Sequence, residues 1–196
     1  NPNHFSNVGT SGGGISILSA QTLTNSDFMT GAFPAEYGNA NSGVFDLKLR
    51  KGNNQKTERT IQAGFLGTDL AIEGPFKKGY NGSYLINYRY STLSMLGALG
   101  VPVGDAITNF QDISYNVFLP TEKAGNFSLF GFGGLSNQNF DAKKDSSAWK
   151  NNYDRYSWNF RSNTGAAGLT HFLQLDSKTY LRSVFLVAGT GKGYEE

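Results

Sequence analysis

SYLINYRYS, residues 83–91, alternates two kinds of side chain at every second position. One set is aromatic or apolar and the other is mostly polar: Tyr84, Ile86, Tyr88 and Tyr90 against Ser83, Leu85, Asn87 and Arg89. A period of two is that of a β-strand whose faces meet different surroundings. The stretch therefore predicts a strand with one aromatic face and one wetter face.

The same alternation recurs further along the chain. In residues 112–119, Ile113, Tyr115, Val117 and Leu119 alternate with Asp112, Ser114, Asn116 and Phe118. In residues 155–161, Tyr156, Trp158 and Phe160 alternate with Arg155, Ser157, Asn159 and Arg161. Seven strands are predicted in all, at residues 60–66, 69–73, 83–91, 112–119, 127–136, 153–175 and 179–188. The sixth is long enough to predict a bend or bulge around residues 164–168.

The connections between these strands alternate in length. Short turns at 74–82, 119–126 and 175–178 are separated by long connections at about 92–110 and 139–153. This rhythm is typical of hairpins that cross a slab, trimmed at one end and elaborated at the other.

The alternation has two interpretations. The apolar faces form the core of a soluble β-sandwich, or they face lipid around a polar lumen. Tyr and Trp side chains near strand ends favour the membrane, where such rings lie at the headgroup level. The candidates for this interface are Tyr84, Tyr88, Tyr90, Tyr156 and Trp158.

Residues 1–56 have a different character, that of a small mixed α/β unit with little core of its own. Its last part is FPAEYGNANSGVFDLKLRKG, residues 33–52, in which Glu36-Tyr37-Gly38 predicts a turn and 44–49 predicts a strand. Phe45, Leu47 and Leu49 then share one side of that strand. Residues 50–59, RKGNNQKTER, form a polar linker to the strands that follow.

Composition excludes several classes of function. Gly makes up 25 of 196 residues and aromatic residues 14%, which favours β-structure over helices. The net charge of +2 is scattered, so a nucleic-acid partner is not expected. There is no Cys, the two His residues are far apart, and GTGKG at 189–193 lacks the spacing of a phosphate loop. We expect no catalytic site, metal or cofactor, and no apolar run reaches the ~18 residues of a membrane helix.

Four segments in order resemble the TonB-dependent outer-membrane receptors of the Bacteroidetes type: GTSGGGISIL, TGAFPAEYGNANSGVFDLKLRKGN, EGPFKKGYNGSYLINYRYS and AGNFSLFGFGGLS. In that family a plug domain fills a 22-stranded barrel. The resemblance implies that 1–52 is the second half of the plug, 53–56 a linker, and 57–196 roughly the first seven strands of an antiparallel transmembrane β-barrel. Its plug turn and last strand would contain Phe33, Pro34, Glu36, Tyr37, Gly38, Gly43 and Phe45.

The resemblance also implies partners and a location. The protein would lie in the outer membrane of a Gram-negative bacterium and import an extracellular ligand when the TonB complex pulls on a segment outside this chain. The long loops at 92–110 and 139–153 would face outside. Residues 33–52 depart from the SusC-like glycan importers, so a SusD-like lipoprotein partner is not implied.

Arg89 and Arg161 are expected on the wet faces of their strands. In a barrel they would point into the lumen, where we expect contacts with plug carboxylates such as Glu36 or Asp46. In a soluble sandwich they would be surface charges. A soluble extracellular binding or adhesion module therefore stays open as the alternative at this point, followed by a porin without a plug.

Overall fold

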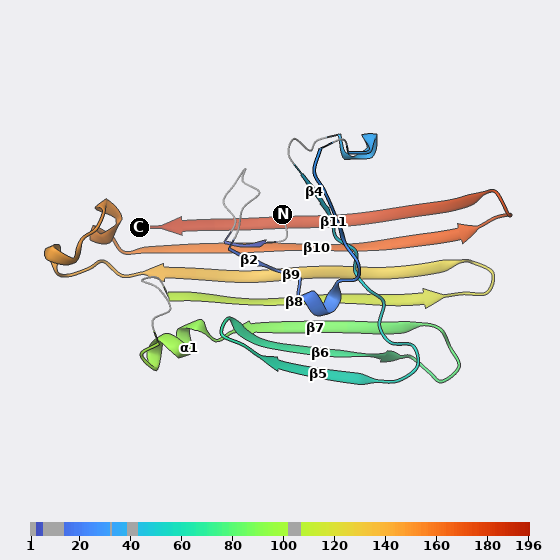
Figure 1. Ribbon diagram of the computed structural model, residues 1–196, viewed down its shortest axis with the longest axis horizontal. Coiled ribbons are helices and arrows are strands. Elements are labelled where there is room, and N and C mark those ends of the chain that lie inside the picture. Colours follow the sequence, from blue (N-terminus) through green and yellow to red (C-terminus); the bar gives the residue numbers. More distant parts are fainter. Residues whose placement is uncertain (1–2, 6–13, 32, 39–42, 102–106) are drawn as a thin grey trace.

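The computed structural model describes residues 3–5, 14–31, 33–38, 43–101 and 107–196. In that part of the chain the fold is mainly β, with antiparallel sheets. The main sheet has seven strands in the order in which they occur in the sequence, and it is open: β5 and β11 form its two edges. Figure 1 shows it as one long slab crossed by the N-terminal part of the chain.

The first three strands have six to nine residues and the last four have 14 to 17. They are β5 (Glu58–Ala63), β6 (Gly67–Pro75), β7 (Ser83–Ser91), β8 (Ile107–Pro120), β9 (Asn126–Phe140), β10 (Trp158–Gln174) and β11 (Tyr180–Glu195). The predicted number of strands and the three short turns are confirmed. The long connections contain α1 (Leu93–Ala98) in one case and η3 (Ser146–Ala148) and η4 (Asn152–Arg155) in the other.

The predicted bulge at 164–168 is wrong. β10 pairs with β9 and with β11 in an unbroken register from Asn159 to Phe172, so it stays regular across this stretch. Four strand ends also differ from the prediction by several residues. β8 begins earlier, β9 ends later, β10 begins at Trp158 because η4 occupies the predicted start, and β11 continues through the GTGKG stretch, which therefore lies within a strand.

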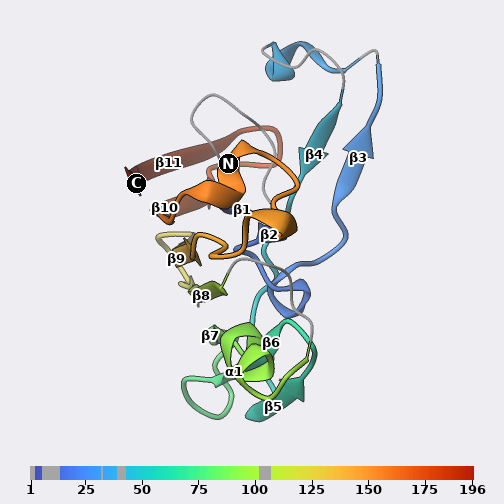
Figure 2. The same ribbon diagram turned by 90° about the vertical axis from the view of Figure 1, so that its left-hand side faces the viewer.

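The N-terminal part consists of short elements. β1 (Asn3–His4) pairs with β2 (Ile15–Ser16), η1 (Ala20–Thr22) follows, and β3 (Asp27–Met29) pairs with β4 (Val44–Asp46) on either side of η2 (Ala35–Tyr37). The predicted turn at 36–38 is confirmed by η2, and the predicted strand at 44–49 is shorter. Figure 2 shows these elements on one side of the sheet, with the β3–β4 hairpin projecting beyond it.

The two faces of the sheet follow from its register, because residues paired across strands share a face. One face carries Asn87, Ser114 and the pair Arg89 and Asp112, and the N-terminal elements lie on it. We call it the covered face. The other face, which we call the open face, carries Tyr88 and Ile113, with Leu129 and Leu169 further along the sheet.

The buried side chains of the described residues are unusual in kind. Thirteen are polar or charged and seven are apolar. The open face instead exposes large apolar side chains, for example Ile113 (46%) and Leu129 (44%). Within the described residues, no helix is long and apolar enough to cross a membrane.

Candidate functional site

Three carboxylates on the covered face bind the N-terminal part of the chain. They are Asp69 and Glu73 on β6 and Asp112 on β8. Each lies at an alternate strand position among small or polar neighbours, which is how a strand presents side chains to one face. Together they line the contact between the two parts of the molecule, and we treat this contact as the candidate site.

Asp112 is the most deeply buried of the three. Its Oδ2 lies 2.9 Å from His4 Nε2, and neither side chain is exposed to solvent. The same oxygen accepts hydrogen bonds from Arg89 Nη2 at 2.7 Å and Nε at 3.0 Å. Arg89 also donates to the backbone carbonyl of Ser16. One carboxylate therefore links β1, β7 and β8, and Arg89 extends the link to β2.

Asp69 binds the turn at η1. Ser19 Oγ donates to its Oδ2 at 2.6 Å, and Gln21 Nε2 donates to its Oδ1 at 3.1 Å. Asn87 of β7 donates to Oδ1 as well. Ser19 also caps η1 by accepting from the Gln21 backbone N–H. The residue that begins the turn is thus also the one that attaches it to the sheet.

Glu73 holds the exit from the N-terminal part. Arg50 forms a two-pronged ion pair with it, Nη1 to Oε2 and Nη2 to Oε1, both at 2.7 Å. The Asn53 backbone N–H adds a third bond at 2.7 Å, and Asn116 Nδ2 donates to the Arg50 carbonyl at 3.0 Å. Hydrogen bonding to Glu73 raises the pKa of Arg50 above its usual value. Planar pairs of this kind fix geometry as well as charge.

Two glycines let the N-terminal part approach the sheet. A Cβ on Gly52 would lie 2.0 Å from the Tyr84 carbonyl oxygen, so only Gly permits the chain to pass there. A Cβ on Gly134 would lie 2.6 Å from the His4 ring and 2.8 Å from the Ile17 side chain. The absence of a side chain at Gly134 therefore lets His4 of β1 and Ile17, the residue after β2, pack directly against the sheet.

The polar groups of this interface hold the two parts of the chain together. When the parts separate, the same groups can bind water instead. Its strongest contacts are charge-assisted hydrogen bonds, and its buried polar atoms without a protein partner among the described residues include His4 Nδ1, Asn87 Oδ1, Asp112 Oδ1 and Ser114 Oγ. Separating such a surface exchanges protein partners for water, whereas separating an apolar core exposes hydrophobic area. No cluster of three or more His, Asp or Glu among the described residues could hold a metal ion.

The predicted pairing of Arg89 and Arg161 with Glu36 and Asp46 is wrong in its partners. Arg89 does touch the N-terminal part, but through a backbone carbonyl, and its acidic partner is Asp112 of the sheet. Arg161 lies on the open face and pairs with Glu195 of β11 at 2.7 Å. The ion pair between the two parts runs the other way, from Arg50 to Glu73.

The predicted plug carboxylates lie away from the sheet. Asp46 is 3.4 Å from Lys48 Nζ, and the same ammonium pairs with Asp27 at 2.7 Å. Glu36 is exposed on η2, which also contains Tyr37 and is flanked by Pro34 and Gly38.

The other predicted residues of the turn and strand belong to the projecting hairpin. Phe33 is half-buried, and Gly43 precedes β4. Phe45 stacks on Phe28 with ring centroids 4.3 Å apart, and the Phe45 side chain is 68% exposed. These residues form the β3–β4 hairpin and its tip, and none of the contacts described above with Asp69, Glu73 or Asp112 involves them.

The predicted interface aromatics divide between the faces. Tyr84, Tyr88 and Tyr90 share the open face, and Tyr156 is exposed in the loop before β10. Trp158 lies on the covered face, because it pairs with Phe140 and is an even number of residues from Thr164, the partner of Gly134. The sheet therefore places Trp158 on the opposite face from the three tyrosines. It stacks between Phe140 and Tyr194.

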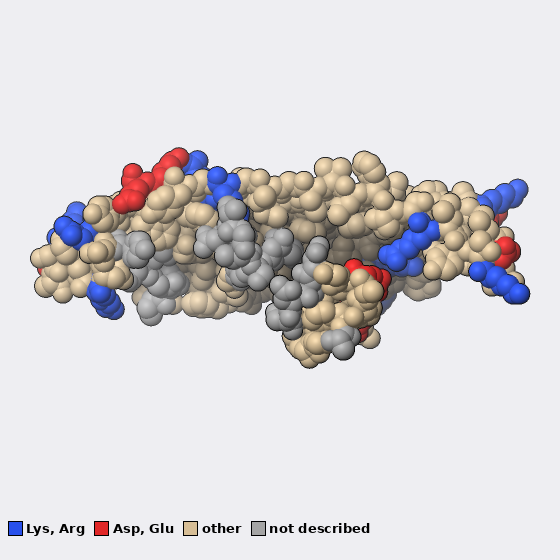
Figure 3. All heavy atoms as spheres, turned by 90° about the horizontal axis from the view of Figure 1, so that it is seen from above, with Lys and Arg blue, Asp and Glu red and all other residues tan. Residues whose placement is uncertain are grey.

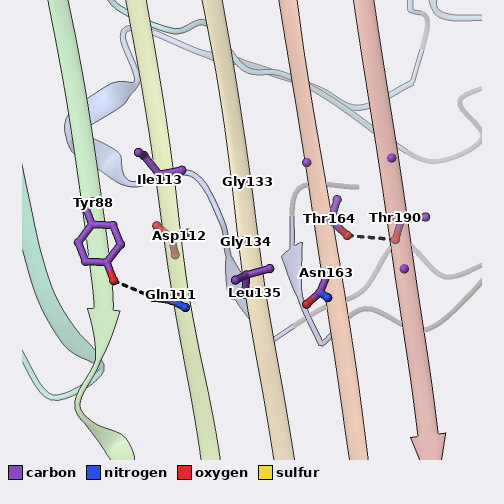
Figure 4. Close-up of a pocket in the computed structure, with 13 residues that line it drawn as sticks. Tyr88, Gln111, Asp112, Ile113, Gly133, Gly134, Leu135, Asn163, Thr164 and Thr190 are labelled. Carbon is purple, nitrogen blue, oxygen red and sulfur yellow. Dashed lines mark hydrogen bonds between the residues drawn. The ribbon is translucent and has the colours of Figure 1, made fainter.

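The open face has a pocket of about 580 Å³ near the middle of β8–β11. Figure 4 shows its lining from Tyr88, whose hydroxyl donates to Gln111, across Ile113 and Leu135 to Asn163, over strands that carry glycine at Gly133. From the pocket toward the long loops the same face becomes polar, with Asn109, Gln111, Asn137, Asn159, Arg161 and Asn163.

Sequence reasoning missed Asp69, Glu73, His4 and Arg50 as contact residues. The available signal was the polar face of residues 112–119, which contains Asp112 and was predicted. The partners themselves are far apart in the chain: His4 and Asp112 are 108 positions apart. No known family model, curated protein or solved structure matches the chain.

Proposed function

We propose that this chain is part of a TonB-dependent active transporter of the outer membrane. In this proposal residues 1–52 are the end of a plug, and the seven-stranded sheet is the first section of a barrel wall closed by further strands. One observation carries it. The face of the sheet that the rest of the chain covers is the polar face, and the apolar face is left open.

This polarity argues against the soluble alternative. In water the hydrophobic effect favours covering the apolar face first, so a β-sandwich would place its second layer over Ile113 and Leu129. Among the described residues no element lies there; the N-terminal elements lie over Asp112 and Asp69 instead. Polar inside and apolar outside is the arrangement of a membrane barrel.

The shape of the sheet supports the same proposal. A strand of about 9–11 residues crosses a bilayer, and β8, β9 and β10 have 14, 15 and 17. The excess lies toward the long loops, where the open face turns from leucine and isoleucine to amides. In Figure 3 the charged side chains along the wall gather toward the two ends of the long axis. The proposed orientation puts the long loops outside the cell.

The contacts suit a plug that must be held and then moved. Asp69, Glu73 and Asp112 bind it through a few directed polar bonds. A pull from the TonB complex on a segment outside this chain would break these bonds in sequence, and water would take over each group. The ligand passes inward along the opened path, and it enters from the side of the long loops.

Cysteine labelling tests the orientation, because the sequence contains no Cys. Lys150 lies in the β9–β10 loop and Lys123 in the β8–β9 turn, and both are exposed. With the protein expressed in a Gram-negative host, a membrane-impermeant maleimide should label Lys150→Cys on intact cells and Lys123→Cys only after lysis. Both variants should sediment with the outer membrane and show heat-modifiable migration. Equal labelling of the two on intact cells, or recovery in the soluble fraction, would contradict the proposal.

A further inference from the structure

The β9–β10 loop is organised around one carboxylate. Asp154, which is only 4% exposed, accepts the backbone N–H of Lys150 at 2.5 Å and of Asn151 at 3.2 Å through Oδ2. Its Oδ1 lies 3.2 Å from Lys143 Nζ. These contacts, the Lys150 hydrogen bond first, hold the pKa of Asp154 below its usual range. The carboxylate stays charged at neutral pH and keeps the two sides of the loop together.

Two hydrogen bonds within the β9–β10 loop hold Trp149 in place. The indole Nε1 donates to the Lys143 carbonyl at 2.8 Å, and the Trp149 backbone N–H donates to the Ser146 carbonyl at 3.3 Å. The ring remains 40% exposed. Arg155 lies over it, with the guanidinium carbon 5.1 Å from the ring centroid. A cation over an indole face is a favourable arrangement, and it restricts a long side chain to one region.

Arg155 has no acidic partner among the described residues. Its neighbour Asp154 points into the loop, and Asp145 binds the backbone N–H and hydroxyl of Ser147. A guanidinium that rests on an aromatic face keeps N–H donors free along its edge, in the fork that matches a carboxylate or a phosphate. The loop thus presents an anchored, unneutralised guanidinium to solvent.

We propose that Trp149 and Arg155 form a recognition point for an oxyanion, a carboxylate or phosphate group carried by the ligand. Arg155 supplies two parallel N–H donors and the charge, and Trp149 holds the guanidinium and offers its free edge to the body of the ligand. The identification of this anion as part of an imported ligand rests on the proposed function. The prediction that the site binds an anion does not depend on that function.

Calorimetric titration of the purified protein with citrate and with pyrophosphate tests the proposal, with sodium chloride at matched ionic strength as the blank. A second readout is Trp149 fluorescence in a Trp158→Phe background, which leaves one tryptophan. We expect saturable binding of at least one probe. Arg155→Gln should weaken it tenfold or more, the scale of one lost charged hydrogen-bond pair. Arg155→Lys keeps the charge but lacks the paired N–H donors, so its affinity should lie between those of the parent and Arg155→Gln. Preference for citrate or pyrophosphate identifies the class of anion.

The matched control is Arg59→Gln, since Arg59 is also exposed but lies on β5, away from the loop. It should bind both probes as the parent does. The absence of saturable binding, or equal affinity of Arg155→Gln and the parent, would overturn the proposal. A soluble protein that still binds anions through Arg155 would refute the transporter and leave this inference standing. If Lys150→Cys is labelled as expected but no anion binds, the anion site is refuted and the proposed transporter stands.

Discussion

Replacing Asp112 by Asn should release the N-terminal elements from the sheet. The substitution keeps the shape of the side chain and removes the charge that Arg89 and His4 share. Arg89 is only 18% exposed, so it would be left as a largely buried, uncompensated cation. Breaking a buried pair from one side costs about 3–5 kcal/mol. Because Arg89 keeps some solvent contact, we expect about 3 kcal/mol, or roughly a hundredfold in an opening equilibrium.

Hydrogen exchange measures this opening directly. The peptide spanning residues 14–24 contains β2 and η1, which bind Arg89 and Asp69 of the sheet, and we expect its backbone hydrogen bonds to open more often once the segment undocks. Its exchange should speed up roughly a hundredfold in Asp112→Asn. The matched control is Asp46→Asn, since Asp46 and Lys48 form a solvent-screened pair at 3.4 Å that contributes little to stability. Unchanged exchange in Asp112→Asn, or equal acceleration in both variants, would refute the reasoning.

Three further predictions concern single contacts. Gly134→Ala should destabilise docking and accelerate exchange in residues 14–24, because its Cβ would strike His4 and Ile17, whereas Gly133→Ala, whose nearest neighbour would be 3.8 Å away, should leave exchange unchanged. Arg50→Lys should cost about 2 kcal/mol in urea unfolding, since the ammonium cannot replace both bonds to Glu73, and an unchanged midpoint would show that the fork contributes nothing. The β9–β10 loop should keep its order at neutral pH and lose it only below about pH 4: the pKa of Asp154 is lower in the folded loop than its ordinary 3.8, so its contribution is present above 3.8 and is lost as pH falls through the folded value. Trp149 fluorescence in a Trp158→Phe background should report this transition, and Asp154→Asn should already show the disordered signal at pH 7.

Local features of the fold could be predicted from the sequence. The strand at 83–91 matches β7 at both ends, and the turn at 36–38 is present, because alternation and turn residues act over a few positions. The number of strands follows from the same local signals.

The sequence did not allow us to predict which side chains of different strands share a face of the sheet. Periodicity indicates that the two sides of a strand differ. It does not indicate which side of one strand shares a sheet face with a given side of the next strand. In β10 the aromatic residues Trp158 and Phe160 lie on the covered face while Leu169 lies on the open face, so the apolar side changes along one strand. Arg161 was therefore predicted on the wrong side.

The contacts of the candidate site also lay beyond sequence reasoning. Each joins residues that are distant in the chain, as Arg89 and Ser16 are at 73 positions apart, and depends on where the N-terminal elements cross the sheet. Polar residues on an alternating strand indicate a wet face. They do not indicate which segment will bind there.

Spin labels on the two faces of the sheet report whether the open face contacts lipid. Single-cysteine labels at Ile113, Leu129 and Leu169 report the open face, and labels at Ser114, Ser128 and Thr170 report the covered face. In bilayers, the open-face labels should collide readily with oxygen and little with a water-soluble nickel complex, while the covered-face labels should be shielded from oxygen. Open-face labels that collide freely with the nickel complex, or that are shielded from both reagents as in a protein core, would contradict the account.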